Sequence, residues 1–504
     1  MNIVADFLKR SVALYPGKVA LADGERTFTY RELEVLVGKV AAGIRSLGIV
    51  PGERIAYHGN NRWEIVVTLL ASIEAGTILV PLNVMLRPAE LTPILEETAI
   101  RLVLTTAEGD GTLRELAGSP LYPQWVSSYD DPRGLFSSWI EKQESRSDAV
   151  ARAPADIIAL FFTSGTTGKP KGAPIDHIFI EHLAHSWVIA CRYTAADVFL
   201  VTTPMFWTVA PIHGILPIVL VGGTLVLMNR FDTAQCCELV KRWNVTSFFG
   251  VPTMYTLLLD REREKLGQLR SLRACSVAGA PVAKDLVDDF EQLTGAALLN
   301  IYGATEAGAI SRDLLSAPRR AGYAGPWGGT VEAKIVDAEG HRVGPGVPGE
   351  ILARGFTVIR GYWRGGRVVP ESLPDGWFHT GDIGVVEDGF VKILDRAKDM
   401  IITGGANVYP AEVEAVLAKH PKLTLCAVIG VPDRVKGEVA VAYVIPKESD
   451  PPTAEELDAH CRKHLSNYKV PRNYVFVPSL PMTSTGKIQK RALRAMAAEA
   501  IRSV

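Results

Sequence analysis

The sequence predicts an α/β protein with a large N-terminal part and a smaller C-terminal domain. Apolar strand-like segments alternate with amphipathic helix-like segments from residue 27 to about 310, a pattern typical of parallel sheets flanked by helices. After residue 325, strand-like segments are joined by Glu-Gly and Asp-Gly turns, which favour β-hairpins. Beyond residues 396–399 a compact unit mixes helices and strands, and we place a domain boundary there.

The individual elements follow in a regular order. The N-terminal part begins with the helix "YRELEVLVGKVAAGIRSLG", ending at Gly48, then the strand "RIAYHG", the helix "RWEIVVTLLASIEAG" and the strand "TILVPL". Later strands are "DVFLVTT", "TLVLM", "TSFFGV", "RACSVAG" and "ALLNIYG", separated by helices such as "DTAQCCELVKRW". The segment from about 108 to 150 is less regular and is expected to be loop-rich. In the C-terminal unit a capping box of Thr453 and Glu456 opens a helix.

The composition is that of an ordinary soluble globular protein. The chain has 504 residues, 47% of them hydrophobic and 22% charged, and its net charge of −1 gives no reason to expect nucleic acid or an acidic membrane as partner. No apolar run approaches the ~18 residues that span a bilayer, and the N-terminus lacks a signal-peptide core. The six cysteines form no CxxC pair, so we expect reduced thiols in a cytoplasmic protein. His177, His182 and His185 lack metal-site spacing and are expected to face solvent.

The stretch "TSGTTGKPKG", Thr163–Gly172, is the first candidate for a functional site. It follows the apolar run "DIIALFF" and precedes a helix for which Asp176 is the expected N-cap. A strand that enters a Gly/Ser/Thr loop before a helix can turn its backbone N–H groups toward an anion. The GxxxxGK[ST] pattern is not met, because Pro170 follows Lys169. The stretch is therefore a candidate phosphate loop of another kind, with a solvated glycine loop as the alternative.

Four further segments carry polar, glycine-rich turns. They are "NIYGATEAG" (300–308), "GWFHTGDIG" (376–384), "ILDRAKDMIITGGANVYPAEVE" (393–414) and "PMTSTGKIQK" (481–490). Each alone is more often a turn or a surface patch than a site. All five segments in this order and spacing are much harder to explain by coincidence.

On these five segments the chain resembles the adenylate-forming superfamily, which includes acyl-CoA synthetases, peptide-synthetase adenylation domains and firefly-type luciferases. Within that superfamily it is similar to an acyl-CoA synthetase over essentially all of its length. The resemblance implies an N-terminal adenylation domain of two helix-flanked sheets and a small β-barrel (1–395), a hinge (396–398) and a mobile C-terminal cap domain (399–504). It also implies a reaction in which a carboxylate attacks the α-phosphorus of ATP, giving an acyl-adenylate and pyrophosphate. The thiol of coenzyme A then displaces AMP, and Mg²⁺ assists.

The resemblance assigns residues to the nucleotide. Tyr302 would stack on adenine, Asn300 would read its edge, Asp382 would contact the ribose hydroxyls, and Arg396 would reach ribose or phosphate. The full set implied at the nucleotide is Thr163, Ser164, Gly165, Thr166, Thr167, Gly168, Lys169, Gly279, Ala280, Asn300, Tyr302, Gly303, Ala304, Asp382 and Arg396.

It also assigns the catalytic and coenzyme A residues. Thr305 would contact the α-phosphate, Glu306 would hold Mg²⁺, and Lys487 would bridge the attacking carboxylate and the α-phosphate. Lys487 has to leave before the thiol enters, and Lys398 matches the hinge position about which the C-terminal domain swings. The residues implied beside coenzyme A are Gly404, Gly405 and Lys469.

The acyl pocket is expected between residues 204–214, 277–281 and 303–308. Its candidate wall residues are Trp207, Val209, Ala210, Ala278, Ala307 and Gly308. The commonest family pattern has histidine where this chain has Trp207, whose indole either borders the acid or packs in the core. These stretches contain no arginine for a second carboxylate, Ile301 stands where malonate-type ligases have one, and no aspartate follows Trp207 for a substrate ammonium. We infer an apolar monocarboxylic acid: medium-chain, aromatic or alicyclic.

Two other functions stay open at this point. One is an acyl-adenylate-forming enzyme that loads the phosphopantetheine of a carrier protein. The other is a non-catalytic nucleotide- and acid-binding protein on the same fold. The sequence leaves the oligomeric state open between monomer and homodimer, and it predicts neither a nucleic-acid partner nor integral membrane association.

Overall fold

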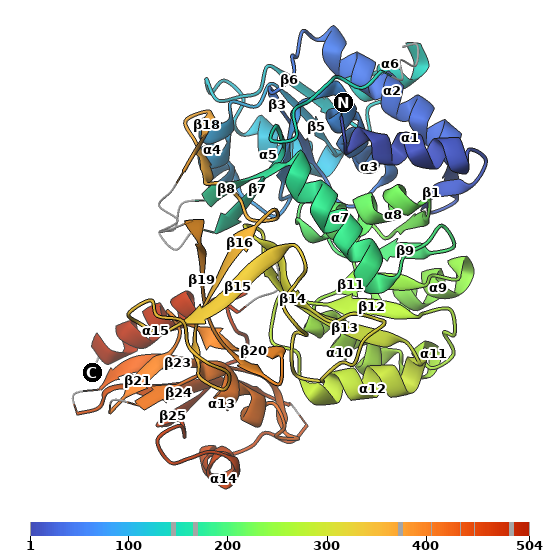
Figure 1. Ribbon diagram of the computed structural model, residues 1–504. Coiled ribbons are helices and arrows are strands. Elements are labelled where there is room, and N and C mark those ends of the chain that lie inside the picture. The colour runs from blue at the N-terminus through green and yellow to red at the C-terminus, as the bar shows by residue number, and fades with distance from the viewer. Residues whose placement is uncertain are drawn as a thin grey trace. The chain divides into compact units, whose positions relative to one another are not determined.

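The computed structural model describes residues 2–142, 148–164, 170–370, 376–404, 406–433, 435–447, 449–482 and 488–502 (Figure 1). The chain divides into two compact units. The first comprises Met1–Ala333 and Ala353–Phe378, and the second comprises Lys334–Leu352 and His379–Val504. The hinge predicted at residues 396–398 falls inside the second unit, and it stays a prediction.

The first unit contains two eight-stranded sheets. The first sheet has the order β14 (Gly308–Arg312), β13 (Ala297–Ala304), β12 (Ala274–Val277), β11 (Ser247–Gly250), β9 (Val198–Val201), β10 (Thr224–Leu227), β1 (Val19–Asp23) and β2 (Arg26–Thr29). The second has the order β18 (Arg367–Val369), β17 (Tyr362–Arg364), β8 (Pro170–Asp176), β7 (Ile157–Ser164), β4 (Ile78–Leu82), β3 (Arg54–His58), β5 (Leu102–Thr105) and β6 (Trp125–Ser128). The strands from β13 to β1 and from β7 to β6 pair in parallel, as the alternation of strands and helices predicts.

The largest hydrophobic cluster fills the space between these two sheets. Side chains alternate between the faces of each strand, so Phe199 and Val201 of β9 belong to this central cluster while Leu200 belongs to a second cluster on the outer face. Figure 1 shows α7 running between the sheets. The helices that contribute to the central cluster are α1 (Ala5–Leu14), α2 (Tyr30–Ser46), α3 (Trp63–Ala75), α6 (Leu135–Lys142), α7 (His177–Cys191) and α8 (Leu216–Val221).

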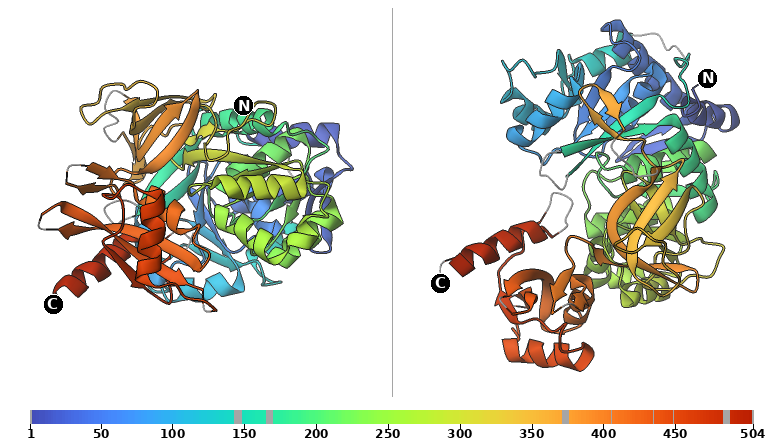
Figure 2. Two further views of the ribbon diagram at one scale, coloured as in Figure 1. Left: turned by 90° about the horizontal axis from the view of Figure 1, so that it is seen from below. Right: turned by 60° about the vertical axis from the view of Figure 1, so that its left-hand side comes forward.

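Further helices cover the outer faces of both sheets. The first sheet is covered by α9 (Thr233–Trp243), α10 (Pro252–Arg261), α11 (Arg263–Leu266) and α12 (Lys284–Thr294), which are seen from below in Figure 2. The second sheet is covered by α4 (Pro88–Thr98) and α5 (Ala107–Arg114). Local sequence sets the helix ends: Asp176 caps α7 by accepting a hydrogen bond from Phe179 N at 2.8 Å, which confirms the predicted N-cap.

The second unit is built on smaller sheets. A four-stranded sheet has the order β15 (Val331–Val336), β16 (Gly349–Gly355), β19 (Phe378–Glu387) and β20 (Phe390–Arg396). A five-stranded sheet contains β22 (Ala406–Val408), β21 (Ile401–Thr403), β24 (Gly437–Pro446), β23 (Leu423–Asp433) and β25 (Asn473–Phe476). Helices α13 (Pro410–Leu417) and α14 (Ala454–His464) pack on one face of the five-stranded sheet and α15 (Lys490–Arg502) on the other. The capping box of Thr453 and Glu456 at the start of α14 is confirmed.

The α/β class, with a large N-terminal part and a smaller C-terminal one, is confirmed. Residues 108–150 hold most of α5, strand β6 and α6, and the other described residues there are turns and loops, in keeping with the loop-rich segment expected. One expectation is wrong. His177 does not face solvent but is 2% exposed, because it lies where α7 meets the loop before β7. All six cysteines are free and buried, and no helix in the described ranges combines the length and the apolar composition that crossing a bilayer requires.

Candidate active site

The strand before the predicted phosphate loop reaches the turn after β13. Strands β7 and β8 are antiparallel, and Thr163 lies opposite Lys171 at the base of the loop. Thr163 Oγ1 donates a hydrogen bond to Oε1 of Glu306 at 3.2 Å, across 143 residues of sequence. The fold therefore brings together a residue predicted for phosphate binding and the residue predicted for Mg²⁺.

Tyr362 of β17 is a further contact of this carboxylate, and sequence reasoning missed it. Its hydroxyl donates to the same Oε1 of Glu306 at 3.0 Å. The Nζ of Lys171 lies 4.8 Å from the centre of the Tyr362 ring, within cation–π range. Two hydroxyl donors on one oxygen fix the orientation of the Glu306 carboxylate.

The β13–β14 hairpin presents Thr305 and Glu306 in its turn. A Cβ atom on Gly303 would lie 2.0 Å from the carbonyl oxygen of Gly308, so this close approach of two backbones requires glycine. A β-bulge shifts the register between Tyr302 and Gly303, as is common beside active sites. The backbone N of Ile359 donates to the carbonyl oxygen of Glu306 at 2.8 Å and holds the turn from outside.

The residues predicted around adenine lie at the ends of β12 and β13. Tyr302 is buried, whereas Gly279 and Ala280 are exposed after β12, with Gly279 at φ +92°. Asn300 is buried, and its Nδ2 donates to the carbonyl oxygen of Tyr323 at 2.8 Å. This contact fixes the side chain and leaves its acceptor oxygen as the group that could take a hydrogen from an amine. Gly303 and Ala304 follow at the end of the strand.

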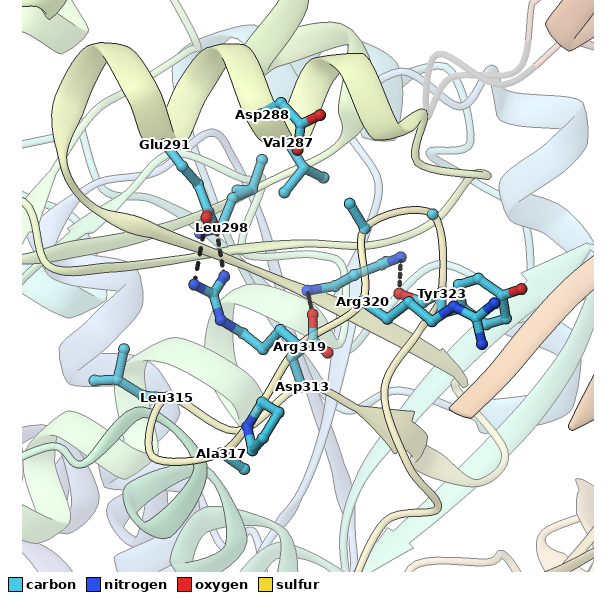
Figure 3. Close-up of a pocket in the computed structure, with 14 residues that line it drawn as sticks. Val287, Asp288, Glu291, Leu298, Asp313, Leu315, Ala317, Arg319, Arg320 and Tyr323 are labelled. Carbon is cyan, nitrogen blue, oxygen red and sulfur yellow. Dashed lines mark hydrogen bonds and ion pairs between the residues drawn. The ribbon is translucent and has the colours of Figure 1, made fainter. Parts of the chain in front are cut away.

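A polar pocket of about 370 Å³ adjoins Asn300 on the side of α12 (Figure 3). Asp313 lines it: Oδ2 accepts from the backbone N of Asn300 at 2.9 Å, whereas Oδ1 is buried without a hydrogen-bond partner. Burial raises the pKa of Asp313 to about 6. Arg319 forms an ion pair with Glu291 at the opposite wall, so the pocket has both signs of charge. Because Leu298 also lines it, the pocket extends from Asn300 toward the start of β13.

Asp382 and Arg396 are directly opposite each other in the β19–β20 hairpin of the second unit. Asp382 Oδ1 lies 3.1 Å from Arg396 Nε, with Asp382 buried and Arg396 exposed. The backbone N of Asp382 donates to Thr380 Oγ1 at 3.0 Å. This arrangement presents a carboxylate and a guanidinium side by side, as a ribose and a phosphate would require.

The residues predicted for the hinge and for coenzyme A also lie in this unit. Lys398 is exposed between β20 and β21, and Gly404 has a left-handed φ of +58° just after β21. Lys469 Nζ contacts both carboxylate oxygens of Glu412 at 2.7 Å. A phosphate of coenzyme A would therefore have to share Lys469 with Glu412.

The predicted acyl-pocket residues gather at the central cluster. Trp207, Val209 and Ala278 are half-buried and pack against it, and Ala210 belongs to it. Ala307 and Gly308 are buried in the hairpin that carries Glu306. Val209 begins a π-helix, η1 (Val209–Ile215), and such segments are frequent at functional sites. The Nε1 of Trp207 is buried with no hydrogen-bond partner.

Several predicted residues lie outside the described part of the chain. They are Gly165, Thr166, Thr167, Gly168, Lys169, Gly405 and Lys487, together with the side chain of Ser164.

The donor set of the described residues fits Mg²⁺ bound to a nucleotide. No group of three or more His, Cys, Asp or Glu side chains that could hold a metal occurs in the described ranges. Mg²⁺ does not need such a cage, because it is usually held by one or two carboxylates and by phosphate oxygens. Glu306, oriented by Thr163 and Tyr362 beside the phosphate loop, provides a carboxylate of this kind.

A carboxylate that two hydroxyls orient at the base of the predicted phosphate loop, with an apolar cluster nearby, suits an enzyme that uses a nucleotide to act on an apolar substrate. Comparison with known proteins identifies the family. Residues 8–363 match the AMP-binding enzyme family and residues 412–487 match the AMP-binding enzyme C-terminal domain, so the chain belongs to the AMP-binding, adenylate-forming enzymes.

Similar proteins share nearly the full length of the chain. Feruloyl-CoA synthase of Amycolatopsis sp is 36% identical over 491 residues, which cover 96% of this chain and 97% of that protein. The 3-[(3aS,4S,7aS)-7a-methyl-1,5-dioxo-octahydro-1H-inden-4-yl]propanoyl:CoA ligase of Rhodococcus jostii is 34% identical, over 97% of both chains. The crystal structure of ATP-bound MatB from Rhodopseudomonas palustris superposes with a TM-score of 0.90 at 29% identity, over 98% of both chains. The protein is an AMP-forming acid–thiol ligase that uses ATP, Mg²⁺ and coenzyme A, so the non-catalytic alternative is wrong.

Proposed function

We propose that the acid is an apolar monocarboxylic acid with an aromatic or alicyclic body, with medium-chain acids as the next class. The observation that carries this proposal is the apolar wall of Trp207, Val209 and Ala278, which are half-buried against the central cluster. A large indole and small aliphatic side chains favour a ring over a charged or amino-bearing acid. Feruloyl-CoA synthase and the Rhodococcus jostii ligase are named for an aromatic and a fused-ring acid, which supports the proposal.

The phosphate end is proposed to involve Thr163, the loop after it, Thr305 and Glu306. Bound Mg²⁺ supplies positive charge that neutralises the phosphate oxygens. Thr163 and Tyr362 both donate to Oε1 of Glu306, so the other oxygen, Oε2, remains for the cation. Thr305, next to Glu306 in the turn, is placed to donate to the α-phosphate.

The nucleoside end is proposed to use Tyr302, Asn300 and the backbone at Gly279 and Ala280. Asn300 is held by its contact with Tyr323, so its acceptor oxygen suits the exocyclic amine of adenine. The exposed glycine at position 279 lets the backbone approach the base closely.

The second unit is proposed to supply the remaining groups. Asp382 would accept from the ribose hydroxyls while Arg396 donates to ribose or phosphate. Lys487 would bridge the carboxylate and the α-phosphate, and Lys398 would be the hinge between domains 1–395 and 399–504. Gly404 and Gly405 would line the path of the thiol, with Lys469 near the nucleotide end of coenzyme A.

The test is an ATP–pyrophosphate exchange screen over matched acids. We expect exchange with cinnamic and cyclohexylpropanoic acids, weaker exchange with octanoic acid and none with malonic acid. AMP and pyrophosphate should appear in step with the thioester, whereas ADP and phosphate would contradict adenylation. Offering coenzyme A against a phosphopantetheinylated carrier protein decides whether a carrier is also an acceptor. Preference for malonic acid would overturn the proposed acid class.

A further inference from the structure

A buried guanidinium without a counter-charge lies beside the proposed acid pocket. Arg312, the last residue of β14, is 4% exposed, and it forms no ion pair with any described residue. Its Nε and Nη1 are buried with no hydrogen-bond partner. Burial lowers the pKa of Arg312 to about 10, so the group is still charged at neutral pH. Buried charges in proteins are normally paired, so this one needs an explanation.

The side chain of Arg312 is directed into the space between the two sheets. Arg312 is paired across the hairpin with Ile301, and residues directly opposite in a sheet share a face. Ile301 and Ala309 belong to the central cluster, and the bulge in the hairpin puts Ala309 and Arg312 on that same face. The guanidinium carbon of Arg312 accordingly lies 5.9 Å from the ring centre of Trp187 on α7.

Two further polar atoms without partners surround this guanidinium. The Nε1 of Trp187 and the Nδ1 of His213 are both buried without a hydrogen-bond partner, and the two rings are 5.0 Å apart. Burial, followed by the positive charge of Arg312, lowers the pKa of His213 to about 3, so its ring is neutral. Arg312 and Trp187 provide only donors, and a neutral histidine can provide another. The group that completes this cluster must therefore be a hydrogen-bond acceptor.

His213 connects the cluster to the wall of the acid pocket. It lies on η1 with Val209 and Ala210, six residues after Trp207. His213 and Trp207 are both half-buried, so each keeps some solvent-accessible surface. Arg312 and Gly308 are paired with Ile301 and Ala304, which are three residues apart on β13, so Arg312 lies roughly 10 Å along the strand from Gly308. That length suits an acid with a ring, and it is too long for acetate.

This inference rests on the proposed function and makes its acid class more specific. We propose that Arg312, with His213 and Trp187, binds a hydrogen-bond acceptor oxygen at the end of the acid opposite its reacting carboxylate. The oxygen belongs to a ring ketone or a phenol, so the acid keeps a single carboxylate. The acid is then apolar in the middle and polar at both ends, and Arg312 is a specificity-determining residue.

Matched pairs of acids test this proposal. One pair is para-hydroxycinnamic acid and cinnamic acid. The other pair is cyclohexylpropanoic acid with and without a ketone at the para position of the ring. In addition, para-carboxycinnamic acid tests a negatively charged acceptor. In the unmodified enzyme kcat/KM should favour at least one acceptor-bearing acid over its partner by roughly 10- to 100-fold, as expected where a site is built to bond a polar group. Arg312→Met should remove that preference, because it should lower kcat/KM for the acceptor-bearing acid far more than for its unsubstituted partner. A gain for the ketone or the phenol supports the proposal, whereas a gain for para-carboxycinnamic acid alone would contradict it, because that acid has two carboxylates.

Two controls separate specificity from folding. Arg312→Lys keeps the charge but loses the planar fork, so it should keep part of the preference. Arg273→Met removes the arginine that directly precedes β12 and is paired with Asp197 at 2.6 Å, and it should lower the melting temperature without changing the ratio within a pair. If Arg312→Met lowers activity equally on both members of each pair, or leaves a preference unchanged, the proposal is overturned. If no acid of the panel supports pyrophosphate exchange in the unmodified enzyme, it is the proposed function that fails.

Discussion

Glu306 and Arg312 lie six residues apart on one hairpin, and their surroundings are opposite in kind. The Glu306 carboxylate accepts hydrogen bonds from Thr163 and Tyr362, so it is held in place by the protein itself. The Arg312 guanidinium has two nitrogens buried without partners. With the roles proposed above, the nucleotide end of the site would be organised before ligands bind, whereas the acid end would be completed by the substrate.

This difference explains how one fold can serve many acids. Hydrogen bonds that the protein makes to itself cost nothing further when the nucleotide binds, and they act equally for every acid. Donors without partners penalise any acid that cannot satisfy them. Selectivity among acids should then arise at the Arg312 end, and rate enhancement at the Glu306 end.

The largest effect is expected where the two ends meet, at the bond between carboxylate and α-phosphorus. Lys487→Ala should slow adenylate formation by a factor on the order of 10²–10³, the loss typical of one transition-state donor. A pre-made acyl-adenylate should still be converted to thioester at a near-normal rate. Rapid-quench measurement of each half-reaction tests this, and equal losses in both would mean that Lys487 has a structural role.

The next largest effect is expected when the negative charge of Glu306 is removed. Glu306→Gln removes the negative charge and keeps the shape, and it should lower pyrophosphate exchange by a factor on the order of 10². The factor should be the same for every acid, and added Mg²⁺ should restore part of the activity. A loss that depends strongly on the acid would break the distinction between the two ends.

At the acid end the effect should be graded by substrate. Trp207→Ala removes a large apolar wall, so kcat/KM should shift toward bulkier acids by about 1–3 kcal/mol per methylene accommodated. The KM for ATP should barely change, since the nucleotide residues lie on other loops. If all acids lose activity equally and the melting temperature falls, Trp207 packs in the core and the pocket must be redrawn around His213 and Pro211.

The smallest effect is expected when one of the two hydrogen bonds to the Glu306 carboxylate is removed. Tyr362→Phe removes one of the two donors to the carboxylate, and loss of such a supporting contact costs about 10-fold in metal affinity. Half-maximal activity should then need a higher Mg²⁺ concentration, while the rate at saturating Mg²⁺ stays close to normal. Thr163→Val is the matched variant on the other donor and should act in the same direction. A loss that saturating Mg²⁺ does not repair would assign Tyr362 to another role.

Features with local causes could be predicted from the sequence. The N-cap at Asp176, the capping box at Thr453 and the alternation that gives parallel sheets all depend on neighbours within a few residues. The five glycine-rich segments were recognisable because their order is characteristic of the family. Among them, Thr163 and Glu306 are brought into contact by the fold.

Features that depend on long-range contacts could not be predicted. Tyr362 meets Glu306 across 56 residues, and nothing in the local sequence distinguishes it from other strand tyrosines. Arg312 resembles a surface arginine in sequence, and its burial results from packing against α7. The three stretches predicted to form the acid pocket contain no arginine, and Arg312 lies on β14 just beyond the last of them, residues 303–308. His177 is buried for a similar reason, since its helix position meets a loop that is distant in sequence.

The connection between β20 and β21 also offers a place to divide the polypeptide. Strand β20 ends at Arg396 in the four-stranded sheet, and β21 begins at Ile401 in the five-stranded sheet. A break between Ala397 and Lys398 would thus leave every strand pairing of the described residues intact, and each piece would keep its own sheets and hydrophobic clusters. We expect that the two pieces, produced as separate polypeptides, regain thioester-forming activity when fused partners bring them together. The enzyme would then serve as a split reporter of proximity.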